Sequence, residues 1–119
     1  MVIDFSVIEE LKELQTDGEP DIIHELIDAF LEAAPEHMET IRKAAIDGAA
    51  RDLQSAAHAL RGSSSAIGAI PLSESLQKLE DMGKGNDLSS ATAEVTRAEA
   101  LLKEAETALS ELRSRGNPK

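Results

Sequence analysis

Hydrophobic residues recur every three or four positions along most of this chain, a spacing that predicts helices. The clearest stretch spans 20–47, where the apolar stripe continues past Pro35. Proline lacks a backbone N–H, so we expect one long helix that is kinked or briefly broken near Pro35. Upstream, Ser6-Val7-Ile8-Glu9 has the spacing of a capping box and predicts a short helix that ends near Leu14.

Three more helices are predicted in the rest of the chain. One spans about 50–67, and Pro71 begins the next, which carries a leucine-rich stripe and ends at a loop, Gly83-Lys84-Gly85-Asn86. The last helix follows Asp87 as its N-cap. The core stripe of the 50–67 helix is Leu53, Ala57, Leu60, Ser64 and Ile67. The two heptad positions of the last helix hold Leu88, Val95, Leu102 and Leu109, and Ala91, Ala98, Ala105 and Leu112.

Four substantial helices joined by short connections predict an all-α fold, an antiparallel up-down four-helix bundle with a short extra N-terminal helix. Aromatic residues are only 2% of the chain, so aliphatic side chains and alanine must fill the core. With 119 residues, we expect a single domain over 1–119. Its helical core spans about 4–115, and 116–119 form a frayed tail.

Composition excludes several classes of function. The net charge of −11 makes a nucleic-acid binder improbable on electrostatic grounds and disfavours anionic membranes. No apolar run approaches the ~18 residues of a transmembrane helix, and the N-terminus does not resemble a signal peptide. The absence of cysteine excludes disulfides and thiolate chemistry. We therefore expect a cytoplasmic protein.

One histidine stands apart from the core stripe of its helix. His58 follows Ala57 and is turned ~100° away from that stripe, so it is predicted to face solvent. The residues on its own face are polar or small: Arg51, Gln54, Ser55, Arg61, Gly62 and Ser65. A lone surface histidine is usually without function, so the argument depends on its neighbours.

These neighbours suit the transfer of a phosphoryl group. Neutral imidazole is a competent nucleophile at cytoplasmic pH. Arg61, one turn further on, can place a positive charge beside a bound phosphoryl group. Gly62 costs the helix about 1 kcal/mol relative to alanine, which indicates a steric need for free access.

No other cluster predicts chemistry. His24 and His37 are thirteen residues apart and there is no Glu-x-x-His motif, so we expect no metal site. There is also no glycine-rich nucleotide loop, and 119 residues leave no room for an ATP-binding domain beside the bundle.

The stretch from His58 to Ala69, His-Ala-Leu-Arg-Gly-Ser-Ser-Ser-Ala-Ile-Gly-Ala, resembles the signature of histidine-containing phosphotransfer (HPt) domains, His-x-Leu-Lys-Gly-Ser-x-x-x-x-Gly-Ala. The leucine-rich stretch that follows contains the Leu79-Glu80 pair typical of the family, and 26–35 is similar to the family's first bundle helix. The likeness covers roughly residues 4 to 112. One departure is Ala49, where the family commonly has a helix-capping aspartate.

The resemblance implies roles for four residues. His58 is expected to accept the phosphoryl group through Nε2. Arg61 replaces the commoner lysine and stabilises the charge of the phosphate, while Gly62 gives steric access. Glu80 falls where the family often has glutamine or glutamate and orients the ring or a water molecule, although it equally suits a solvated charge.

The resemblance also implies a phosphorelay intermediate. The phosphoryl group comes from the phosphoaspartate of a receiver domain, in a hybrid histidine kinase or a response regulator, and passes to an aspartate of a second receiver. The protein is then a phosphocarrier without autokinase activity and without a cofactor of its own, because Mg²⁺ is held by the partner receiver. Small residues near His58, such as Ser55, Ser65 and Ala66, are a candidate docking patch.

Two alternatives remain open on the sequence. The first is a helical adaptor that binds receivers without accepting phosphate. The second, compatible with phosphotransfer, is a helical dimer built on the heptads of the last helix. Those alanine-rich positions are needed inside the bundle, so we expect a monomer.

Overall fold

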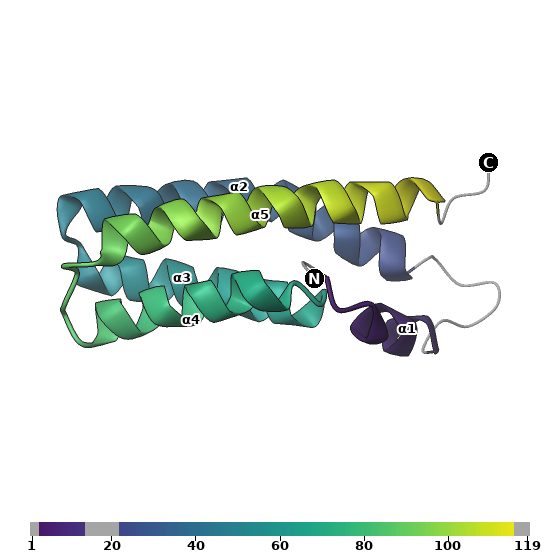
Figure 1. Cartoon of the computed structure of the whole chain (residues 1–119), viewed down its shortest axis with the longest axis horizontal. Helices are drawn as coiled ribbons and strands as arrows, with labels where there is room; N and C mark the ends of the chain where they lie inside the picture. Colours follow the sequence, from purple (N-terminus) through teal and green to yellow (C-terminus); the bar gives the residue numbers. More distant parts are fainter. Residues whose placement is uncertain (1–2, 14–21, 116–119) are drawn as a thin grey trace.

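The computed structural model describes residues 3–13 and 22–115 (Figure 1). This part of the chain contains five helices and no strand: α1 (Phe5–Glu13), α2 (Ile22–Asp47), α3 (Ala50–Ala66), α4 (Ile70–Lys84) and α5 (Ala91–Arg115). α3 packs against α2 and α4, and α5 completes the bundle against the same two helices. The antiparallel four-helix bundle with an extra N-terminal helix is therefore confirmed. The predicted helix start at residue 20 and the tail at 116–119 lie outside the described residues.

α2 runs unbroken through Pro35, so the alternative of a brief break is wrong. Pro35 is on the exposed side of the helix, where water can bind the carbonyl that loses its partner. Ala34, just before the proline, and Met38, three residues after it, are buried in the core. Burial of side chains before and after the proline thus holds the two halves of α2 in one helix.

The core is almost entirely aliphatic, as the composition predicts. Phe30 is the one buried aromatic side chain in the described part of the chain. Every residue of the predicted α3 stripe is buried: Leu53, Ala57, Leu60, Ser64 and Ile67. The heptad residues of α5 between Ala91 and Leu109 are buried too. Leu88, which lies three residues before α5, and Leu112, near its end, are half-buried. Helical periodicity therefore identifies the core correctly.

The predicted loop at 83–86 begins too early, because α4 continues to Lys84. Gly83 is buried inside this helix, facing α3. A Cβ at this position would lie 2.6 Å from the carbonyl oxygen of Ala50 and 2.8 Å from the backbone nitrogen of Gln54. Gly83 is thus a helix-packing residue that lets α3 and α4 approach closely.

Three predictions about helix caps can be compared with the structure. That of Asp87 as the N-cap of the last helix is wrong, because α5 begins at Ala91 and Asp87 Oδ1 accepts from the backbone N–H of Ser89, which lies before the helix. α1 is capped by Asp4 and not by Ser6, because the backbone N–H of Ser6 donates to Asp4 Oδ1 at 3.0 Å. The backbone N–H of Asp4 donates in turn to the carbonyl of Gly68 at 2.7 Å, which fixes α1 to the α3–α4 turn. Ala49 at the start of α3 makes no side-chain cap, as its departure from the family pattern indicates.

Candidate functional site

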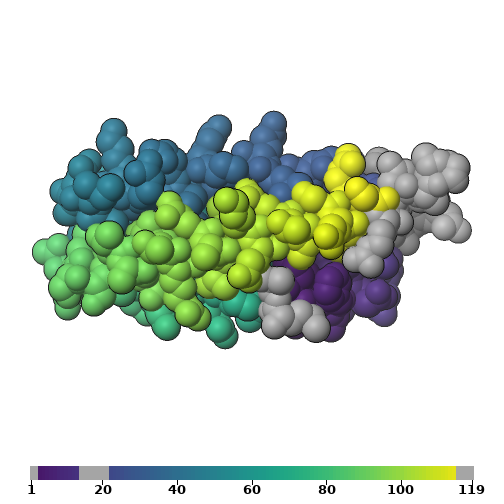
Figure 2. Space-filling view, turned by 45° about the horizontal axis from the view of Figure 1, so that its top comes forward, coloured from purple at the N-terminus to yellow at the C-terminus, as the bar shows by residue number. Residues whose placement is uncertain are grey.

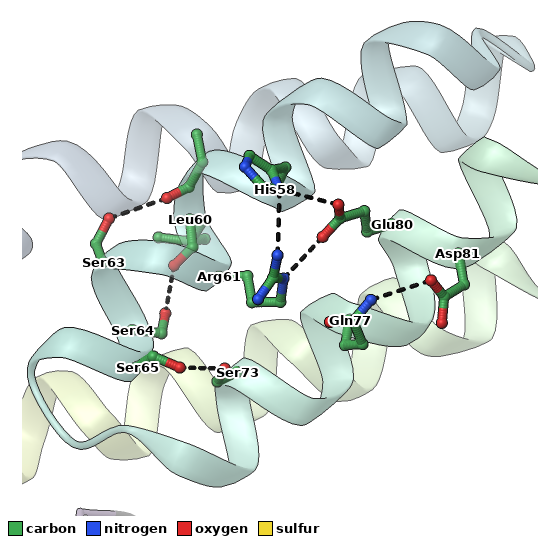
Figure 3. Close-up of polar contacts among 11 residues, drawn as sticks. His58, Leu60, Arg61, Ser63, Ser64, Ser65, Ser73, Gln77, Glu80 and Asp81 are labelled. Atoms are coloured by element: carbon green, nitrogen blue, oxygen red, sulfur yellow. Dashed lines mark hydrogen bonds and ion pairs between the residues drawn. The ribbon is translucent and has the colours of Figure 1, made fainter.

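His58 projects from α3 into solvent beside a buried glutamate of α4 (Figure 3). Its side chain is 65% exposed, and Nδ1 lies 2.9 Å from Glu80 Oε2. The side chain of Glu80 is only 8% exposed. Arg61 completes the cluster, because its Nε donates to Glu80 Oε1 at 2.7 Å. The structure thus brings together His58, Arg61 and Glu80, which the sequence analysis named separately.

Close packing of α3 against α4 explains why Glu80 reaches the histidine. On one side of Glu80 along α4, Gly83 allows the two backbones to approach. On the other side, the hydroxyls of Ser65 and Ser73 form a hydrogen bond of 2.9 Å between the same helices. Glu80 lies between these two contacts, so its carboxylate is held against the outer face of α3.

The contacts of His58 define the tautomer of its ring. A carboxylate can only accept hydrogen bonds, so the contact with Glu80 requires a proton on Nδ1. Arg61 Nη2 also lies 3.2 Å from Nδ1. Both groups are donors when Nδ1 is protonated, so this second contact is a close approach and not a hydrogen bond. The neutral ring therefore keeps its lone pair on Nε2, which has no hydrogen-bond partner within the described residues.

Glu80 is a charged group in a nearly buried position. Burial by itself raises the pKa of this carboxyl, but hydrogen bonds from Arg61 and His58 outweigh it and bring the pKa below its ordinary value. Glu80 is therefore ionised at neutral pH. The positive charge of Arg61 balances it, so the cluster has no net charge while His58 is neutral.

Gly62 is exposed on α3, on the face that carries His58. A Cβ built at this position meets no atom within 4 Å, and the backbone is ordinary helix. The fold itself therefore does not require a glycine here. This distinguishes Gly62 from Gly68, whose φ of +86° and whose contact with Asp4 do require one.

An apolar hollow of about 230 Å³ opens between α2 and α3 beside this face. Its lining is mostly small or aliphatic: Leu26, Ala29, Phe30, Ala33, Ala34, Leu60, Ser63, Ala66 and Ile67. Sequence reasoning missed the α2 side of this hollow. The available signal was the exposed, apolar Leu26, Ala29 and Ala33, three to four residues apart on one helix face.

The candidate docking patch of the sequence analysis is divided by the structure. Ala66 lines the hollow between α2 and α3. Ser65 is turned to the other side, where it hydrogen bonds Ser73 of α4. Ser55 is exposed and does not line the hollow.

The other two histidines are both half-buried on α2. Within residues 3–13 and 22–115, no group of three or more His, Asp or Glu side chains is placed to hold a metal ion. None of the helices described is long and apolar enough to cross a membrane.

An up-down helical bundle that exposes one histidine, with its second ring nitrogen bound to a buried carboxylate, has the architecture of a histidine phosphotransfer protein. A sequence profile described as the Hpt domain matches residues 25–115, which cover nearly all of α2 and the whole of α3 to α5. The chain belongs to the Hpt domain family, whose members are phosphocarriers of phosphorelays and not kinases.

A solved structure supports this assignment. The chain is similar to histidine-containing phosphotransfer protein B (HptB) from Pseudomonas aeruginosa PAO1, with a TM-score of 0.85 and 25% sequence identity. The match covers 96% of each chain. A comparison with curated protein sequences finds no match.

Proposed function

We propose that His58 accepts a phosphoryl group from the phosphoaspartate of one receiver domain and delivers it to the aspartate of another. The observation that carries this proposal is the ring geometry. His58 is 65% exposed, and its Nδ1 is held 2.9 Å from a buried carboxylate. A partner can therefore reach Nε2, the nitrogen that keeps the lone pair.

The chemistry follows from this tautomer. The Nε2 lone pair attacks phosphorus, the bond from phosphorus to the aspartyl oxygen breaks, and the electron pair leaves with the receiver carboxylate. The ring becomes positively charged while Nδ1 keeps its proton. Glu80 accepts the hydrogen bond from that N–H and stabilises the developing charge. Mg²⁺ belongs to the acidic pocket of the receiver, and the Hpt protein needs no cofactor of its own.

Arg61 has a different position from that expected of a residue that only binds phosphate. Its Nε is bound to Glu80 at 2.7 Å, on the Nδ1 side of the ring. Without it, the carboxylate of Glu80 would repel the incoming phosphoryl dianion. We assign to Arg61 the neutralisation of Glu80, with its remaining guanidinium N–H groups close enough to the ring to stabilise the phosphoryl charge.

The receiver docks over the outer face of α3 in this proposal. Gly62 leaves room above the helix next to His58, since a Cβ there meets no atom within 4 Å. Ser63, the next residue, lines the apolar hollow between α2 and α3, which offers a surface to an apolar helix of the partner. The carrier works as a cytoplasmic monomer between a hybrid histidine kinase and a response regulator, and has no autokinase activity.

The test is transfer of radiolabelled phosphate from a phosphorylated receiver domain to the purified protein. We expect label on the wild type and on His37→Gln, the matched control on α2, and none on His58→Gln. The label should be acid-labile and base-stable, as phosphohistidine is. Transfer that persists in His58→Gln would overturn the proposal. Receiver binding without transfer to the wild type would favour the adaptor alternative.

A further inference from the structure

A second feature on the His58 face has no role in the transfer chemistry. Arg51 lies seven residues before His58, two helical turns and about 10 Å along α3, and leaves the helix in nearly the same direction. Arg51 is exposed and has no ion-pair partner among the described residues. The other arginines with described side chains each pair with a carboxylate: Arg42, Arg61, Arg97 and Arg113.

Lys84 is the last residue of α4, and Arg51 is the second residue of α3. The close packing of Gly83 against Ala50 places the end of α4 next to the first turn of α3. Lys84 follows Glu80 by four residues, so both leave α4 on the same side. Lys84 is exposed and also has no ion-pair partner within the described residues. We call Arg51 and Lys84 together the basic pair.

The acidic residues within three positions of the basic pair are Asp52, Asp81 and Asp87, and Asp87 accepts hydrogen bonds from Ser89. Asp52 lines a hollow against α2 together with Glu39 and Lys43. Asp81 accepts a hydrogen bond from Gln77 of its own helix. The basic pair is thus a positive spot on a protein whose net charge is −11. Most of the surface repels an acidic partner, and this spot attracts one.

We infer that the basic pair is a specificity contact, which selects and orients receivers that carry carboxylates at the edge of their docking surface; this rests on the function proposed above. His58 lies between two unlike contacts. The apolar hollow flanks it toward the C-terminal end of α3, and the basic pair flanks it toward the N-terminal end. A partner must therefore present an apolar helix at one end and acidic side chains at the other, which sets a single orientation over Nε2.

The test compares Arg51→Glu/Lys84→Glu with Arg97→Glu/Lys103→Glu, which makes the same change of charge on α5, away from the His58 face. Lys103 lies on α5, which runs along the face seen in Figure 2 and packs against α2 and α4, diagonally across the bundle from α3. The substrate is one phosphorylated receiver domain that transfers to the wild type. The readouts are the bimolecular rate constant at low receiver concentration and the single-turnover rate at saturation.

We expect the basic-pair variant to lower the bimolecular rate constant about tenfold at low salt, with the saturated rate unchanged. The deficit should disappear near 1 M salt, where the Debye length is only ~3 Å. The control variant should change the rate constant less than twofold. Equal rate constants for the two variants, or a deficit that salt does not remove, would overturn the inference.

A failure of the variants to fold is not expected to cause the lower rate constant. Glutamate in the first turn of α3 is favourable to the helix dipole, so Arg51→Glu is expected to fold normally. Lys84→Glu places an acid at a helix C-terminus, so Arg51→Glu alone is measured as well, with an expected threefold loss. A wild type that accepts no phosphate from any receiver contradicts the proposed function, whereas normal transfer with no effect of the basic pair contradicts this inference alone.

Discussion

Gly62→Ala should make the protein more stable and a poorer phosphoacceptor at the same time. Alanine is better than glycine inside a helix by about 1 kcal/mol. The new methyl group meets no atom within 4 Å, so no clash offsets this gain. For a chain of 119 residues, whose unfolding entropy is about 2.1 cal/mol/K per residue, we expect the melting temperature to rise by about 4 °C.

The same methyl group stands on the face through which a receiver must reach Nε2. If it prevents the phosphoaspartate from reaching attack distance, the lost transition-state contact should slow transfer at least tenfold, equivalent to about 1.4 kcal/mol. Thermal unfolding and single-turnover transfer from a phosphorylated receiver measure the two effects on one sample. Thr107→Ala on α5 is the control, because it also improves helix propensity at an exposed position but lies away from His58.

Three results would refute this reasoning. Unchanged transfer in Gly62→Ala would show that Gly62 is not needed for access. A lower melting temperature would show that the backbone at residue 62 needs glycine for the fold. Equally slow transfer in Thr107→Ala would show that added stability, and not the methyl group beside His58, causes the loss.

Three further predictions concern α4 and its contacts. Glu80→Gln should slow the saturated transfer rate about tenfold with little change in the receiver concentration for half-saturation, because a neutral amide stabilises the charged ring less; an unchanged saturated rate contradicts this role. The pKa of Glu80 is lowered by folding, so its contribution to stability is present above its ordinary value of 4.5 and is lost as the pH falls through the lower folded value. Denaturant unfolding should therefore show a steeper loss of stability below pH 4.5 in the wild type than in Glu80→Gln, and equal slopes would contradict the assignment. Gly83→Ala should destabilise by about 1–3 kcal/mol, because its Cβ would overlap the Ala50 carbonyl, whereas Gly85→Ala, at the C-cap of α4, is a milder control; equal losses would show that helix approach is not the cause.

The sequence by itself determined where the helices lie, apart from the end of α4 and the start of α5, and which sides of them are buried. The 3.6-residue period of a helix repeats along the chain, so the α3 stripe and the α5 heptads could be assigned without knowledge of their partners. It also determined that His58 faces outward, since it is one residue past a buried position. Because the connections between successive helices are short, neighbouring helices had to run antiparallel, as in an up-down bundle.

Only the tertiary structure decided how the helices meet. Gly83 looked like a loop residue because glycine usually ends helices, but here it is the contact that brings α4 close to α3. Glu80 could equally have been solvated, and that same approach places its carboxylate 2.9 Å from Nδ1 of His58. The apolar hollow and the basic pair also join residues of different helices. Periodicity within a helix describes the direction of each side chain relative to its own axis, whereas the site depends on distances between axes, which packing alone sets.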